Sequence, residues 1–117
     1  MDKDILLKAI EETSINTSTV QAVESIYGKC NNEEAKKLIT ISANPIHSNG
    51  WRVLSLNEIM KASEQLQVDF ADRGLLPLID YFDNDFIVYD LKDAYWEMYN
   101  IVEDVKYMRT DDLSSLL

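Results

Sequence analysis

Hydrophobic residues in the first half of the chain recur three and four positions apart, which is the spacing of one face of an α-helix. Val20, Val23 and Tyr27 show this spacing, and three further segments repeat it. The periodic segments predict helices over residues 4–13, 17–27, 33–42 and 56–67. This half of the chain is therefore expected to be mainly helical.

Residues that favour helix ends stand at the borders of these segments. Thr17 or Ser18 is the expected N-cap of the second helix, and Asn32 that of the third, because their side chains accept hydrogen bonds from free backbone N–H groups. Ser55 and Glu58 stand three positions apart and form a capping box, in which each side chain binds the other residue's backbone N–H. These caps locate the helix starts.

After Gly74 the pattern changes to short β-branched and aromatic runs separated by Asp and Asn, which is typical of antiparallel hairpins. Strands are predicted over residues 51–54, 75–79, 86–89 and 94–101, with a further short strand over 105–108. Phe86–Tyr89 is apolar at four successive positions, so we expect this strand to lie centrally and to be covered on both faces. Residues 113–117 are predicted to form a final helical turn.

Helices followed by a meander predict an α+β fold. In this fold an antiparallel meander sheet carries the N-terminal helices on one face, and a short helix follows at the C-terminus. A length of 117 residues suits one domain, and no linker-like stretch divides the chain. Residues 1–117 are therefore expected to form a single domain.

The composition argues against several classes of protein. Cys30 is the only cysteine, which excludes an intramolecular disulfide and a multi-thiolate metal site. No apolar run approaches the roughly 20 residues that span a bilayer, and the acidic start Met1–Asp4 is unlike a signal peptide. We therefore expect a cytoplasmic protein with no membrane partner.

The net charge of −10 is unevenly distributed. Residues 1–66 hold nine acidic and seven basic side chains, whereas residues 67–117 hold twelve and four. A negative field repels nucleic acid and favours either a basic partner or simple solubility. The basic residues are scattered and match no familiar nucleic-acid module. A nucleic-acid partner is therefore not expected.

The residues that most often carry catalysis are isolated in this sequence. His47 is the only histidine, and its neighbours lack metal-ligand spacing. Cys30 follows a predicted helix end, where the partial negative charge disfavours a thiolate. The sequence contains neither a glycine-rich phosphate loop nor a nucleophile elbow. We therefore expect no catalytic residue, no metal and no cofactor, and a protein that is not an enzyme.

Five aspartates fall within fourteen residues and leave several interpretations open. They are Asp80, Asp83, Asp85, Asp90 and Asp93. The segment 83–85 resembles the start of a calcium loop, but Ile87 and Val88 stand where that loop needs an oxygen ligand and a glycine. Paired carboxylates also serve hydrolases, which need both in one concave pocket with separated pKa values. The favoured interpretation is a set of turn-forming residues on an acidic edge, and a partner-facing acidic patch is the main alternative.

Alternation along residues 94–101 places Tyr95, Glu97 and Tyr99 on one face of the strand, so that one face is a candidate for exposure. Exposed Tyr and Trp bordered by acids are common at binding hot spots. The predicted partner-binding residues are Asp83, Asp85, Asp93, Tyr95 and Glu97. The residues assigned to the core are Trp51, Ile79, Phe86 and Val88.

Two segments resemble a known family. Asn49–Ile59, with the sequence NGWRVLSLNEI, resembles the G-W-R-L-L-S-L-E-E-I step of the SUKH superfamily, and Leu76–Leu91 is similar to its P-F-x-x-D-G-x-G-D hairpin. The order of elements is similar over residues 17–117. The chain departs from the family where Asn84 replaces a common glycine, where Cys30–Glu33 replaces a Leu-Pro pair, and in its shorter C-terminal helix.

The SUKH superfamily groups bacterial immunity proteins of polymorphic toxin systems with fungal cell-wall-assembly regulators. The resemblance implies a non-enzymatic protein-binding domain that neutralises a cognate toxin, often a basic nuclease. The charge of this chain also suits a basic partner. The alternative is a structural or regulatory interaction protein that acts through self-association or assembly. Either function is compatible with a monomer or a homodimer.

Overall fold

A computed structural model describes residues 3–117 of the chain, and Met1 and Asp2 lie outside the described part. The α-helices are α1 (Lys3–Glu12), α2 (Thr17–Tyr27), α3 (Glu33–Ile41), α4 (Leu56–Leu66) and α5 (Phe70–Arg73), and the 3₁₀ helix is η1 (Leu113–Leu116). The strands are β1 (His47–Ser48), β2 (Trp51–Val53), β3 (Leu75–Asp80), β4 (Asp85–Asp90), β5 (Tyr95–Asn100) and β6 (Val105–Thr110).

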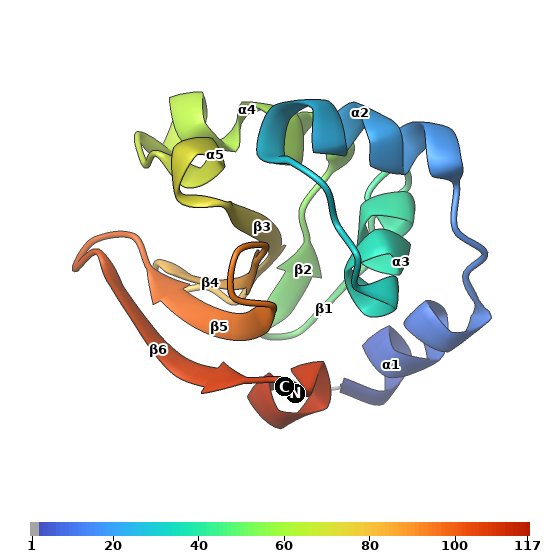
Figure 1. Ribbon diagram of the computed structural model, residues 1–117. Helices are drawn as coiled ribbons and strands as arrows, with labels where there is room; N and C mark the ends of the chain where they lie inside the picture. Colours follow the sequence, from blue (N-terminus) through green and yellow to red (C-terminus); the bar gives the residue numbers. More distant parts are fainter. Residues whose placement is uncertain (1–2) are drawn as a thin grey trace.

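The six strands form one sheet in the order β1-β2-β3-β4-β5-β6, and every neighbouring pair is antiparallel. In Figure 1 the strands β3–β6 occupy the lower left of the molecule, and the helices α1–α5 lie above them and to the right. The predicted α+β class, with a meander sheet, N-terminal helices and a short C-terminal helix, is confirmed.

The helix starts follow the predicted side-chain chemistry with one exception. Ser55 and Glu58 form the expected capping box, and Asn32 accepts a hydrogen bond from the backbone N–H of Ala35 at 2.9 Å. The second helix is capped by Asn16 instead of Thr17 or Ser18, and the Asn16 side chain accepts from a backbone N–H three residues later. Asn is as good an N-cap as Ser, so the first of three adjacent candidates caps the helix.

The core lies between the helices and the sheet, and β4 is its central strand. Five of the six β4 residues are buried, as the continuous apolar run predicts. On one face of β5, Trp96 meets Tyr89 edge-on with ring centroids 5.0 Å apart, and on the other face Tyr99 meets Phe70 of α5 at 5.7 Å. The assignment of four residues to the core is confirmed: Trp51, Ile79, Phe86 and Val88 are all buried.

Two short elements have no counterpart in the prediction. β1 contains two residues, which pair with β2 across the Asn49–Gly50 turn. α5 is a single turn that ends at Gly74, whose φ of 69° is left-handed and whose N–H returns to the carbonyl oxygens of Phe70 and Ala71. Neither segment is long enough to show periodicity, so the hydrophobic pattern does not reveal them.

An ion-pair network joins β2, α4 and β3. Both terminal nitrogens of Arg52 donate to Glu58, at 2.8 and 2.9 Å, and its Nε donates to Asp80 at 3.2 Å. The hydrogen bonds from Arg52 lower the pKa of Glu58 to about 2, with a further contribution from the capping N–H of Ser55. The predicted capping box therefore also anchors α4 to the sheet.

We expect Glu58→Gln to remove a pH-dependent part of the stability. Because the pKa of Glu58 is lower in the folded chain than in the unfolded chain, its contribution is complete above about pH 5 and is lost as the pH falls towards about 2. Urea unfolding should show a less stable variant at pH 7 and a difference that shrinks between pH 5 and pH 3. Glu64→Gln, at an exposed position on the same helix, is the control. A Glu58→Gln deficit that is constant with pH would contradict this account.

Candidate protein-binding surface

The five residues predicted to bind a partner lie near two opposite ends of the β4–β5 hairpin. Asp85 pairs with Asn100 at one end of the ladder, and Asp90 pairs with Tyr95 at the other. Five steps of about 3.4 Å along β4 separate these ends by about 17 Å. Asp83 and Asp85 are therefore at one end, and Asp93 and Tyr95 are at the other, so they do not form a single patch.

At the second end, Arg109 of β6 holds three of the predicted residues together. Its Nη2 lies 3.1 Å from the carboxylate of Asp93, and its Nε lies 3.3 Å from that of Glu97. The guanidinium also covers the ring of Tyr95, 4.7 Å from the ring centroid. These side chains already have a partner within the chain, which leaves less for another protein to bind.

Arg109, Asp93, Tyr95 and Glu97 form one cluster with Asp90 and Lys106. Two carboxylates of this cluster are buried. Asp90 and Glu97 are each only 3% exposed, and both lie near the same two cations, Lys106 and Arg109. Burial opposes ionisation of Asp90, but its pKa is lowered overall because the backbone N–H groups of Asp93 and Lys92 donate to its Oδ1. Burial raises the pKa of Glu97, and the cations only partly offset it. Its Oε1 accepts no hydrogen bond from the described residues.

The exposure expected for one face of β5 is wrong, because Glu97 and Tyr99 are buried on one face and Trp96 and Met98 on the other. Of the β5 residues, Tyr95 alone remains exposed, at 38%.

The carboxylates Asp90 and Glu97 have pKa shifts in opposite directions, which is the electrostatic pattern required of a hydrolase pair. Lys106 and Arg109 pair with both carboxylates. Among residues 3–117, no cluster of three or more His, Cys, Asp or Glu is placed to hold a metal ion.

A β-bulge creates this cluster. Trp96 pairs with Thr110 and Met98 pairs with Tyr107, so β6 has one more residue than β5 between these pairs. Met108 takes up the extra length with a left-handed φ of 56°. Sequence reasoning did not identify Asp90, Lys106 or Arg109 as members of the cluster. For Arg109 the reason is the extra residue, which changes which β6 side chains face β5. No glycine marks the bulge in the sequence.

The turns at the first end of the hairpin are joined to each other. Phe82, Asp83 and Asn84 connect β3 to β4, and all three have positive φ, at 68°, 52° and 68°. The backbone N–H of Ile101, in the β5–β6 turn, donates to the carbonyl of Asn84 at 2.9 Å. The β5–β6 turn is the loop at the far left of Figure 1. Three successive left-handed residues without glycine are costly, so the surrounding contacts must hold this turn in place.

These two turns and the start of β6 carry exposed apolar and acidic side chains, which we name the turn surface. It comprises Phe82, Asp83, Val102, Glu103 and Val105. Phe82 is 45% exposed, Val102 71% and Val105 46%. The carboxylates of Asp83 and Glu103 form no ion pair or hydrogen bond with any residue from 3 to 117. Only Asp83 was predicted from the sequence. Phe82 had a recognisable signal, since an aromatic residue is unusual inside an Asp-rich hairpin turn.

Asp85 belongs to the ladder and not to the turn surface. It is half-buried, and its carboxylate accepts a hydrogen bond from Asn100 Nδ2 at 2.9 Å. Burial raises the pKa of Tyr107 to about 12, and interaction with Asp85 contributes to that rise. Asp85 therefore joins β4 to β5 within the sheet.

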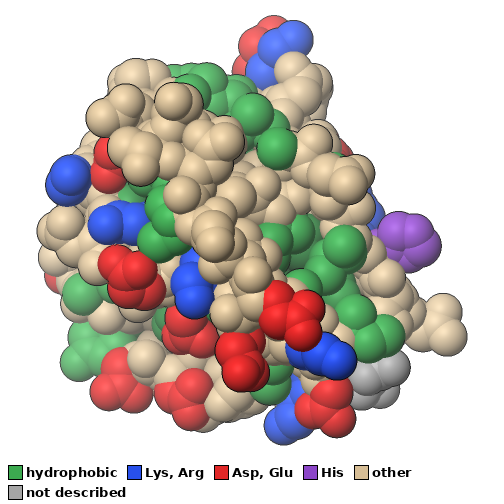
Figure 2. Space-filling model, turned by 90° about the vertical axis from the view of Figure 1, so that its right-hand side faces the viewer, with side chains coloured by type: hydrophobic (Ala, Val, Ile, Leu, Met, Phe, Trp, Pro, Cys, Tyr) green, Lys and Arg blue, Asp and Glu red, His purple; other side chains and the backbone are tan. Residues whose placement is uncertain are grey.

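The face that carries the N-terminal helices has a different character. Figure 2 shows hydrophobic side chains running across it, with Asp and Glu gathered in its lower part among Lys and Arg. Here several acids stand beside cations, as in the pairs Lys8–Glu12 at 3.9 Å and Lys36–Glu33 at 3.8 Å. Within the described part of the chain, the exposed acids of the turn surface form no such ion pairs.

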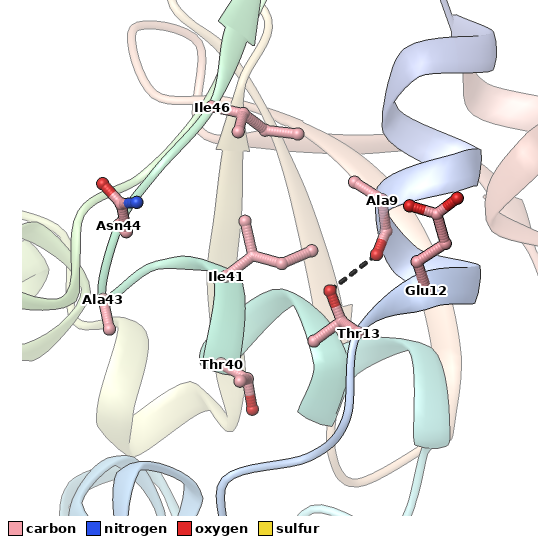
Figure 3. A pocket seen from close by; sticks show the side chains of 8 residues that line it. All are labelled: Ala9, Glu12, Thr13, Thr40, Ile41, Ala43, Asn44 and Ile46. Carbon is pink, nitrogen blue, oxygen red and sulfur yellow. Dashed lines mark hydrogen bonds between the residues drawn. The ribbon is translucent and has the colours of Figure 1, made fainter.

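A largely apolar cavity of about 400 Å³ opens between α1, α3 and the segment that follows α3. Figure 3 shows its lining residues, among which the Thr13 hydroxyl donates to the carbonyl oxygen of Ala9 at 2.6 Å. Among residues 3–117, Glu12 is the one ionisable side chain of its lining, so two acid–base groups of this described part do not converge there.

No family model, curated protein or solved structure matches the chain. The resemblance to the SUKH superfamily thus depends on the two sequence segments and on the order of elements. None of the helices within residues 3–117 has the length and apolar character needed to cross a membrane.

We expect Met108→Gly to be more stable than Met108→Ala by about 1 kcal/mol, because glycine adopts the left-handed bulge conformation without the clash of a Cβ. Urea unfolding of both variants measures the difference. In the control pair, Met60→Gly and Met60→Ala in helix α4, the order should reverse, since glycine is the poorer helix former there by about 1 kcal/mol. Equal stability of the two Met108 variants would show that the bulge is not strained.

Proposed function

We propose that this chain is a protein-binding domain that holds a basic protein partner on its turn surface. The observation that carries this proposal is the pairing of exposed apolar side chains with unpaired acidic ones on two turns that are hydrogen-bonded to each other. In the more specific form of the proposal, the partner is a toxin and the chain is its immunity protein in the cytoplasm of the producing cell.

Phe82 is suited to anchor such a partner. Interfaces draw most of their affinity from a few large side chains that become fully desolvated, with a polar rim around them. Phe82 projects from a turn whose backbone is tied to β4 and to the neighbouring turn, and Val102 and Val105 supply further apolar area. Because this turn is held in one conformation, little ordering entropy remains to be lost on binding.

The charge of this surface supports a basic partner. Asp83 and Glu103 are exposed and form no ion pair with any residue from 3 to 117, and they lie in the half of the chain that carries twelve acidic and four basic residues. Unpaired acids around an apolar centre accelerate the approach of a cationic protein and repel an anionic one. Such a surface selects its partner by charge and retains it by apolar contact.

The toxin assignment draws on the SUKH resemblance of Asn49–Ile59 and Leu76–Leu91. Among the superfamily's bacterial members, the partner is typically a toxin, often a basic nuclease. The structure has the order of elements that the resemblance implies, with a strand, a capped helix and then a meander. Immunity by binding needs no catalytic group, only a surface that is complementary to the toxin.

Affinity capture from a lysate of the source cells, with mass spectrometry, identifies the partner, and two variants then test the surface. Phe82→Ala should weaken binding about 30-fold, which corresponds to a hot-spot loss of about 2 kcal/mol. Asp83→Lys combined with Glu103→Lys should slow association about tenfold at low salt, and the difference should fade at high salt. Asp85 is left unchanged because it bonds within the sheet.

The matched control variants change exposed residues of helices α1, α2 and α4. Ile26→Ala removes a side chain that is 42% exposed, and Glu11→Lys with Glu64→Lys reverses two exposed acids. These variants should bind as the parent does, and all variants should melt within a few degrees of it. A basic partner that binds Phe82→Ala and the charge-reversed variant as tightly as the parent would rule out the turn surface.

Self-association is the second candidate function, and the exposed edge strand β6 favours it. Val105 and Met108 are 46% and 56% exposed on a strand that has only one neighbour in the sheet. If the chain self-associates through β6, sedimentation over a range of concentrations should show a dimer, and Val105→Lys should dissociate it. A parent chain that stays monomeric throughout would discard it, and the bulge at Met108 already hinders edge-to-edge pairing.

A further inference from the structure

A second, polar cavity lies beside the turn surface. It has a volume of about 330 Å³, at the lower end of the roughly 300–1,000 Å³ range of ligand pockets. Its lining residues come from the α4–α5 link, from α5, from β5 and from the β5–β6 turn: Gln67, Val68, Asp69, Arg73, Tyr99, Ile101 and Asp104. Ile101 and Asp104 flank the Val102–Glu103 part of the turn surface, so the cavity and this surface share one turn.

The guanidinium of Arg73 and the hydroxyl of Tyr99 in this cavity are already engaged. Arg73 donates to both oxygens of Asp104, at 2.6 and 3.3 Å, and Tyr99 donates its hydroxyl to the same carboxylate at 2.5 Å. The hydrogen bond from Arg73 and that from Tyr99 lower the pKa of Asp104 to about 2, so the pair stays ionised at neutral pH. The positive charge of Arg73 is therefore neutralised inside the cavity.

The unengaged polar groups include a carboxylate. Asp69 occupies the N-cap position of α5 but makes no capping hydrogen bond, and its carboxylate has no ion pair with any described residue. Gln67 has a left-handed φ of 55°, and its side-chain amide likewise bonds to none of residues 3–117. Val68 and Ile101 form apolar parts of the cavity wall. With two carboxylates against one guanidinium, the lining carries a net negative charge.

We propose that this cavity receives an arginine side chain of the basic protein that binds the turn surface, with the Asp69 carboxylate as its ion-pair partner. This inference rests on the proposed function. A guanidinium presents five donors in a flat fork that matches a carboxylate, and its aliphatic stem packs against apolar walls such as Val68 and Ile101. An anionic group would instead face an unpaired carboxylate and a cation that is already neutralised.

The first test needs no partner protein. The probe is Nα-acetyl-argininamide, titrated to tens of millimolar into the ¹⁵N-labelled chain, with Nα-acetyl-citrullinamide as the uncharged isostere. Saturable amide shifts are expected at residues 67–73 and 101–104 with the arginine compound only. Asp69→Asn should weaken this binding at least fivefold. Asp72→Asn, at an exposed acid on the same helical turn, should leave it unchanged.

Equal shifts from the citrulline compound, or binding that is unaffected by Asp69→Asn, would overturn the proposal. So would the absence of localised shifts. None of these outcomes concerns Phe82. The proposal that the turn surface binds the partner would still be tested separately, by the Phe82→Ala and charge-reversed variants. In the complex, Asp69→Asn should reduce affinity about tenfold while Asp72→Asn does not. A captured partner that binds both variants equally would show that its arginine does not use the cavity.

Discussion

Two buried carboxylates, Asp90 and Glu97, decide how the free edge of this sheet is built. A buried carboxylate needs cations or donors close by, because an uncompensated one destabilises a fold by several kcal/mol. The cations come from β6, and the bulge at Met108 accompanies the approach of Arg109 to Glu97. The strain of a left-handed residue, on the order of 1 kcal/mol, is smaller than that penalty. The register of β6, with its bulge, places Lys106 and Arg109 beside these carboxylates.

This arrangement makes the two ends of the meander chemically different. At the end that holds Asp93 and Tyr95, acids, cations and an aromatic ring satisfy one another, as Arg109 shows by contacting both residues. At the other end Phe82, Asp83 and Glu103 find no partner within the described chain. Exposed groups without internal partners are available to another protein, whereas those already paired must first be released. The turn surface is therefore the end of the meander that is better suited to bind another protein.

The elements were largely predictable, because they depend on local chemistry. Helix periodicity, the Ser55–Glu58 capping box and the apolar run Phe86–Tyr89 each act within about ten residues, and each is found where it was expected. The candidate site was predictable only in part. Asp83 was identified because hairpin turns favour aspartate, but Glu97 was placed on a surface although it is buried. Alternation along β5 shows which side chains share a face of the strand, but it does not show whether other parts of the chain cover that face.

The sequence by itself determined the class of fold, the central position of β4 and the acidic second half. These follow from hydrophobic spacing, cap chemistry and charge, which are properties of neighbouring residues. Only the tertiary structure decided which charges meet. Arg109 is sixteen positions from Asp93 along the chain, and Arg73 is thirty-one positions from Asp104. Such pairs depend on strand register and on a bulge without glycine, and these are set by the packing of the whole sheet.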